Sequence, residues 1–164
     1  VVFGILNADG TIDKKRCQEL IARARPLKVT CHRAFDMTRD PFEALEDCIE
    51  IGSDGILTSG QRPLASDGAE LIGKLVEKAN GRIAIMPGSG VNENTVETIL
   101  HQSGANEIHF SATAFRDSPL IYKNSMIAGM GSDEGSEFKL RVVDPVRVKK
   151  MREIATAAKL SRGQ

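Results

Sequence analysis

A cluster of three side chains near residue 32 is the first group in the sequence that is suited to catalysis or to ligand binding. His32, Arg33 and Asp36 lie within five consecutive positions. An imidazole exchanges a proton near neutral pH, and a neighbouring carboxylate or carbonyl can fix which ring nitrogen carries that proton. We therefore take His32 as a candidate general acid or base and Asp36 as the residue that orients it, with Arg33 available to hold an anion.

Two further groups combine glycines with hydroxyl side chains, a composition that can bind an anion, and Ser111 adds another hydroxyl. Backbone amides in glycine-rich loops can approach a phosphate or carboxylate closely, and hydroxyls add further donors. The same glycines could instead serve only a tight turn that needs positive φ, so both interpretations stay open. Together with the first cluster they give the candidate ligand pocket: His32, Arg33, Asp36, Thr58, Ser59, Gly60, Gly88, Ser89, Gly90 and Ser111.

The candidate residues follow apolar segments that recur at regular intervals. Segments typical of buried strands begin at residues 1, 28, 54, 82 and 107, at intervals of 25 to 28 residues. That interval fits one strand, one crossover helix and two short loops. Alternation of strand and helix predicts a parallel sheet, so the pocket residues are expected at the carboxyl ends of neighbouring strands.

Amphipathic helices with recognisable end signals fill the intervals. We expect helices opened by Asp13 and by Asp40, with Pro41 at the first helical position of the second. Further helices are expected over 67–79 and after Asn92, and a final helix over about 145–160. Between them, residues 113–138 lack helical periodicity and are predicted to form a long loop.

Two α/β architectures fit this pattern, an open doubly wound sheet and a TIM-like (β/α)8 barrel. The turn after the first strand has no GxGxxG pattern, which weakens the doubly wound alternative. Candidate anion loops after the last two strands favour the barrel. A barrel takes roughly 250 residues and eight units. Residues 1–164 are therefore expected to form a single domain that comprises the last five βα units of such a barrel. The sequence is thus expected to begin inside the fold.

Side-chain alternation predicts which residues face the barrel interior. In the segment at 107–112, Ile108 and Phe110 share one face and are expected to meet the helices, which directs His109 and Ser111 inward. The same reasoning applied to a strand through residue 35 directs His32 inward.

The composition of the chain limits its possible binding partners and its cellular compartment. Lys and Arg together number 22, as do Asp and Glu, so no net charge favours a nucleic acid. The apolar runs are too short to span a membrane. Cys17, Cys31 and Cys48 show neither CxxC nor zinc-ligand spacing, which indicates reduced thiols and a cytoplasmic protein. A five-strand sheet would also leave open edges, which predicts a homo-oligomer or cover from further units.

Four sequence strings resemble one known family. HRAFDM at 32–37, LTSG at 57–60, MPGSGV at 86–91 and HFSA at 109–112 are similar to segments of the CutC family of copper homeostasis proteins, as is FGIL at 3–6. The resemblance covers essentially the whole chain. It implies a TIM-like barrel, a cytoplasmic or nuclear location, self-association and binding of copper(I).

The resemblance also implies that the copper ligands lie elsewhere. The cysteines proposed to bind copper in the family precede the FGIL segment, and none of Cys17, Cys31 or Cys48 matches their positions. The metal ligands of this chain are therefore unknown. Two functions stay open: a cytosolic copper(I) binding, buffering or trafficking protein, or a barrel enzyme that acts on a small phosphorylated or carboxylated metabolite. The sequence leaves open whether the protein is an enzyme.

Overall fold

The centre of the structure is a parallel sheet whose strands follow one another in chain order. The computed structural model describes residues 1–122, 124, 126 and 138–161. Its sheet has the order β1-β2-β3-β4. The strands are β1 (Val2–Phe3), β2 (Thr30–Cys31), β3 (Gly55–Thr58) and β4 (Ala84–Pro87). The expected α/β architecture with a parallel sheet is confirmed.

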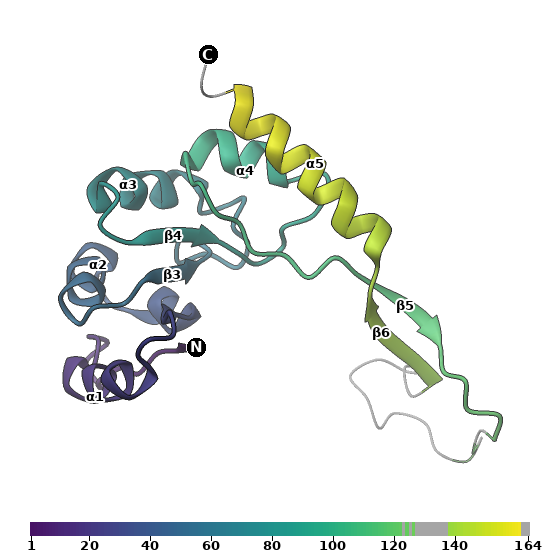
Figure 1. The fold of residues 1–164 in the computed structure, drawn as a ribbon, viewed down its shortest axis with the longest axis horizontal. Coiled ribbons are helices and arrows are strands. Elements are labelled where there is room, and N and C mark those ends of the chain that lie inside the picture. Colours follow the sequence, from purple (N-terminus) through teal and green to yellow (C-terminus); the bar gives the residue numbers. More distant parts are fainter. Residues whose placement is uncertain (123, 125, 127–137, 162–164) are drawn as a thin grey trace.

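Helices connect the strands and cover one face of the sheet. They are α1 (Lys14–Ala24), α2 (Pro41–Glu50), α3 (Ala69–Ala79) and α4 (Val96–Ser103). Figure 1 shows α1, α2 and α3 stacked along one side of the sheet. In register, Phe3, Cys31, Ile56 and Ile85 form one row across the four strands. The last three of these are buried in the main core, whereas Val2, in the neighbouring row, is 60% exposed.

Local capping explains where the first two helices begin. The Asp13 carboxylate accepts a hydrogen bond from the Arg16 amide, and Asp40 accepts from the amides of Phe42 and Glu43. Both caps were expected because the side chain replaces a missing acceptor at the helix start. The later helices start further along than their signals suggested. Asp67 lies before the start of α3, and Asn92 forms a turn that precedes α4.

The expected strand at 28–35 is much shorter than predicted. It ends at Cys31, and Arg33–Met37 form a short 3-10 helix, η1. The His32 side chain accepts a hydrogen bond from the Ala34 amide and so caps η1. Because His32 and Arg33 do not lie on a strand, the alternation argument applied to them was wrong.

The expected fifth strand at 107–112 does not form. The His109 amide donates to the Pro87 carbonyl at 2.9 Å, which places the segment beside β4. No regular ladder extends from this contact among the described residues, and the chain after β4 turns at Ser89, which takes a φ of +87°. The described residues therefore contain four βα units of the expected five.

The predicted loop at 113–138 contains a strand at its start. β5 (Thr113–Asp117) pairs antiparallel with β6 (Lys139–Val143) in a ribbon that projects from the body of the molecule (Figure 1). Residues 123, 125 and 127–137 lie outside the described residues. An exposed two-stranded ribbon needs no apolar face against a core, so the period-two pattern that marks a strand is weak here.

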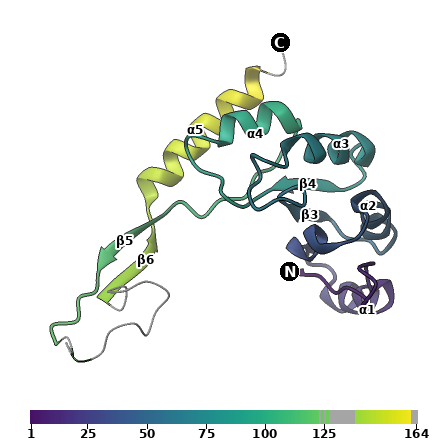
Figure 2. The same ribbon diagram turned by 180° about the vertical axis from the view of Figure 1, so that it is seen from behind.

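The final helix is confirmed. α5 (Pro145–Ser161) follows Asp144, whose side chain accepts from the Val146 amide at 2.8 Å. Met151 and Ala158 are buried against the residues of α4, and Figure 2 shows the two helices side by side. This second small core anchors α5 to the end of the sheet.

Candidate functional site

The site begins at the carboxyl end of β2, where His32 leads into η1. Its Nδ1 atom accepts a hydrogen bond from the Ala34 amide at 3.1 Å. A neutral imidazole that accepts at Nδ1 carries its proton on Nε2. The imidazole also lies against Gly4, where an added Cβ would come within 3.0 Å of Nδ1. A backbone amide, not Asp36, therefore sets the tautomer of His32.

Asp36 is the most heavily hydrogen-bonded carboxylate of the site. It accepts from Arg33 Nε at 2.7 Å and from the Thr58 hydroxyl. The Ser59 amide and hydroxyl donate to it at 3.1 and 3.0 Å, and the Gln61 amide donates at 3.2 Å. The Asp36 side chain is only 6% exposed. Asp36 thereby joins η1 to the loop that follows β3.

The ionisation of Asp36 reflects two opposing effects. Burial raises its pKa, but the hydrogen bonds from Thr58, Arg33 and the Ser59 and Gln61 amides outweigh burial, so the pKa lies below its ordinary value. The carboxylate is therefore charged at neutral pH and has no proton to give. This arrangement makes Asp36 a positioning residue for the loop and for Arg33.

Arg33 is held on one side of its guanidinium and left open on the other. Nε binds Asp36, while Nη2 donates to the Ser59 hydroxyl at 2.7 Å and to the Arg62 carbonyl at 3.3 Å. Nη1 donates to none of the described residues, and the side chain is 42% exposed. A fixed guanidinium with a free donor can bind an anion at low entropic cost.

The open side of Arg33 borders a pocket of about 250 Å³. The pocket brings four predicted residues together from different elements, and it adds Leu57, Val91, His109 and Phe110, which are chain neighbours of predicted positions. No Asp or Glu is among its described lining residues. The lining residues are Arg33, Leu57, Ser89, Gly90, Val91, His109, Phe110 and Ser111.

Side-chain directions on the segment at 108–111 agree with the alternation argument. Ile108 and Phe110 pack against the small core between α4 and α5. His109 and Ser111 are exposed and line the pocket. The alternation holds for Ile108, His109 and Ser111, whereas Phe110 both packs against this core and lines the pocket.

The other predicted residues lie behind the pocket. Thr58, Ser59 and Gly60 are buried, and the Thr58 hydroxyl accepts from the Gly60 amide at 2.9 Å. Gly88 is also buried, and a Cβ there would lie 2.6 Å from Leu57 Cδ1 and 3.3 Å from His109 Cβ. None of these residues lines the pocket beside Arg33, and Gly60 lines a separate groove near the start of α3.

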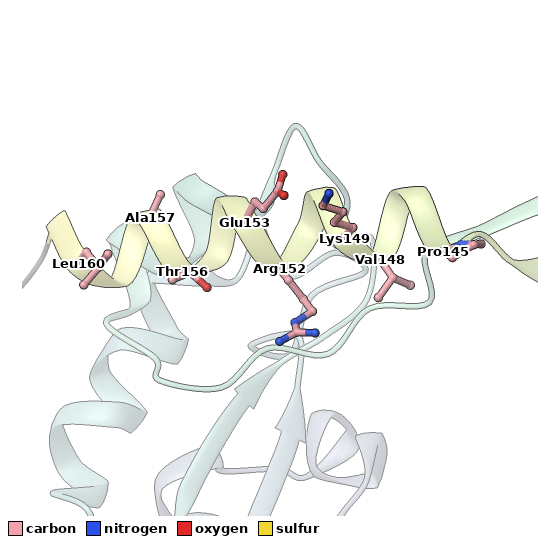
Figure 3. Close-up of a pocket in the computed structure, with 8 residues that line it drawn as sticks. All are labelled: Pro145, Val148, Lys149, Arg152, Glu153, Thr156, Ala157 and Leu160. Atoms are coloured by element: carbon pink, nitrogen blue, oxygen red, sulfur yellow. The ribbon is translucent and has the colours of Figure 1, made fainter.

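A larger groove of about 650 Å³ lies along α5, away from the strand ends. Figure 3 shows its lining side chains, all of which belong to α5, with Lys149 and Glu153 pointing to one side and Arg152 to the other. A groove lined by one helix alone is an exposed helix surface. None of the predicted site residues lines it.

The three cysteines lie in the main core, away from the pocket. The hydrogen bond with Cys31 and burial raise the pKa of the Cys48 thiol, and burial raises that of Cys17. Among the described residues, no three His, Cys, Asp or Glu side chains are grouped as they would be around a metal ion.

Comparison with known proteins places these features in a family. The family model described as "CutC family" matches residues 1–114. The chain belongs to the CutC family. A human relative named copper homeostasis protein cutC homolog is 46% identical over 155 residues, which cover 94% of this chain and 57% of the relative. A CutC family protein of Parabacteroides distasonis is 50% identical over 149 residues, which cover 91% of this chain and 61% of the relative.

A solved CutC structure has a similar fold over part of its length. The crystal structure from Streptococcus agalactiae, described as a CutC copper homeostasis protein, matches with a TM-score of 0.62 and 29% identity. The match covers 66% of this chain and 53% of that one. The chain thus spans little more than half the length of the CutC proteins to which it is similar.

Proposed function

We propose that this CutC-family chain acts in copper homeostasis. The observation that carries the proposal is the 46% identity, over 94% of the chain, to a human protein named for copper homeostasis. The names of the relatives favour this function over an enzyme for a small phosphorylated or carboxylated metabolite.

The proposal treats copper(I) as cargo whose ligands lie outside the described residues. Copper(I) prefers thiolate and thioether ligands. Cys17 and Cys48 are buried thiols with raised pKa, so they do not fit an accessible copper site. We propose that the ligands belong to the additional sequence of a longer protein, because this chain spans 57% of its human relative.

The buried cysteines give a direct prediction. All three thiols are expected to react slowly with a chromogenic disulfide reagent in the native protein, and all three at once after unfolding. Absorbance of the released thiolate measures both rates. In the longer protein that carries the proposed ligands, Cys48→Ala is expected to leave the affinity for copper(I) unchanged in competition with a chromophoric chelator. A fast-reacting native thiol, or a lower affinity in Cys48→Ala, would contradict the assignment of these residues to the core.

Copper tolerance in cells tests the proposed function itself. In cells that lack their own CutC relative, expression of a protein that contains this chain together with the additional sequence proposed above is expected to restore growth at raised copper and to change cellular copper content. Growth at raised zinc serves as the control. Unchanged copper tolerance and copper content, with soluble protein present at normal levels, would overturn the proposal.

The wider assembly is part of the same proposal. We propose a TIM-like barrel, supported by the sequential parallel sheet and by the partial match to the longer Streptococcus chain. We propose a homo-oligomer. This proposal is supported by Phe115 and Val143, which are 66% and 62% exposed on the projecting ribbon. We also propose that the protein lies in the cytoplasm or nucleus. In the described part of the chain, no helix is both long and apolar enough to span a membrane. Sedimentation analysis tests the oligomer, and a purely monomeric protein would contradict it.

A further inference from the structure

The pocket beside Arg33 holds more hydrogen-bond donors than the described chain uses. Arg33 Nη1 has no acceptor among the described residues, and neither do the backbone amides of Ser89, Gly90, Val91 and Ser111. Ser89 and Val91 are half-buried, where amides are normally paired in folded proteins, whereas Gly90 and Ser111 are exposed. A group of adjacent donors without acceptors is typical of a site that an anion completes.

The turn at Ser89 and Gly90 has a conformation that a simple strand end does not need. The two residues take φ values of +87° and +68° in succession, and Ser89 has a side chain that makes this conformation costly. The Ser89 hydroxyl donates to the Pro63 carbonyl at 2.8 Å, which holds the turn in place. The strained turn leaves consecutive amides free beside the cavity, an arrangement that binds anions in other proteins.

The charged group that lines the pocket is a cation. Arg33 is the only charged side chain among the described lining residues, and its Nε is paired at 2.7 Å with Asp36, which does not line the pocket. His109 adds a ring that can donate a hydrogen bond. A donor-rich cavity next to a guanidinium with a free N–H at Nη1 can bind an anion.

The volume limits the size of the ligand. Pockets for drug-sized ligands are typically about 300–1,000 Å³, and this one is about 250 Å³. We propose that the pocket formed by Arg33, the turn at Ser89–Gly90 and Ser111 binds one small oxyanion, the phosphate or carboxylate group of a small molecule. This site is separate from the copper ligands of the proposed function, and it implies binding, not a reaction.

Titration with inorganic phosphate, followed by calorimetry, tests the site. Ser111→Asp places a negative charge at the pocket on an exposed side chain, so it is expected to weaken phosphate binding at least about tenfold. Ser111→Asn is the control for Ser111→Asp, because asparagine has nearly the same shape as aspartate but no charge. Ser111→Asn is expected to bind phosphate with an affinity within about twofold of that of the wild type.

A second pair of variants tests the guanidinium. Arg33→Gln is expected to weaken phosphate binding at least about tenfold. Arg82→Gln removes a guanidinium that pairs with Glu46 far from the pocket, and it is expected to bind as the wild type does. Circular dichroism checks that every variant is folded. Acetate in place of phosphate shows whether the site prefers a carboxylate.

Two results would overturn the proposal. One is the absence of any heat of binding with either phosphate or acetate. The other is equal binding by Ser111→Asp and Ser111→Asn in folded protein, which would place the anion elsewhere. Neither result bears on copper tolerance in cells, so the two proposals fail independently.

Discussion

Replacing Asp36 by alanine is expected to lower the free energy of unfolding by about 2–3 kcal/mol. The change removes the acceptor of the Thr58 hydroxyl, the Ser59 amide and Arg33 Nε, which are left unpaired next to a buried loop. The partial exposure of Arg33 keeps the loss below that of a fully buried ion pair. Urea denaturation measures this loss in the free energy of unfolding.

Asp67→Ala is the matched control for this prediction. Asp67 is exposed, and within the described part of the chain its side chain accepts only from the Ser66 hydroxyl at 3.2 Å. Its removal is expected to change the free energy of unfolding by less than about 0.5 kcal/mol. Equal effects of the two substitutions would show that Asp36 does not hold the loop after β3.

The dependence of stability on pH gives a second readout of Asp36. Its pKa is lowered in the folded state from an ordinary value of 3.8, so the folded protein binds this proton less readily than the unfolded chain does. The contribution of Asp36 is therefore present above pH 3.8 and is lost as the pH falls through the folded-state pKa. In Asp36→Asn, the free energy of unfolding is expected to fall less steeply as the pH is lowered through this range. An unchanged dependence on pH would contradict the assignment of this contribution to Asp36.

Replacing Gly60 by alanine is expected to lower the free energy of unfolding by about 3 kcal/mol. Gly60 has a φ of +69°, and a Cβ there would collide with the Gly68 backbone, 2.8 Å from its Cα. The neighbouring atoms belong to the backbone, so they cannot move aside as a flexible side chain would. Because Gly60 follows Ser59, the strain would also displace the loop that binds Asp36. Thermal unfolding measures the loss.

Gly81→Ala separates the two causes of that loss. Gly81 has a similar φ of +74°, but a Cβ there would meet nothing within 4 Å. Its substitution is expected to cost only about 1 kcal/mol, from the left-handed backbone conformation alone. Equal losses at the two positions would show that the contact between Gly60 and Gly68 adds nothing.

The helices could be predicted from the sequence because their signals are local. The Asp13 and Asp40 caps and Pro41 act within one helical turn, so α1 and α2 form where the sequence indicates. The ribbon of β5 and β6 pairs Thr113 with Val143, thirty positions away, and such pairing leaves little local signal. The expected fifth strand at 107–112 has the alternation of a strand but forms no regular ladder among the described residues, and its residue types do not reveal this difference.

The candidate site was predictable where residues follow neighbouring strands. Ser89, Gly90 and Ser111 come together with Arg33 because β4 and the segment beside it end at the same edge of the sheet. The partnership of Asp36 was not predictable. Its nearest imidazole in sequence belongs to His32, but Asp36 accepts from Thr58 and Ser59, which only the tertiary fold brings within reach.

The most direct test of the anion site is a phosphate titration followed through the backbone amide signals in nuclear magnetic resonance spectra. The account predicts saturable shifts at Ser89, Gly90, Val91 and Ser111, the amides beside the cavity that donate to no described residue. Amides beside the core cysteines Cys17 and Cys48 are expected to stay in place. Saturable shifts confined to other parts of the protein, or no shift at these four amides, would contradict the account.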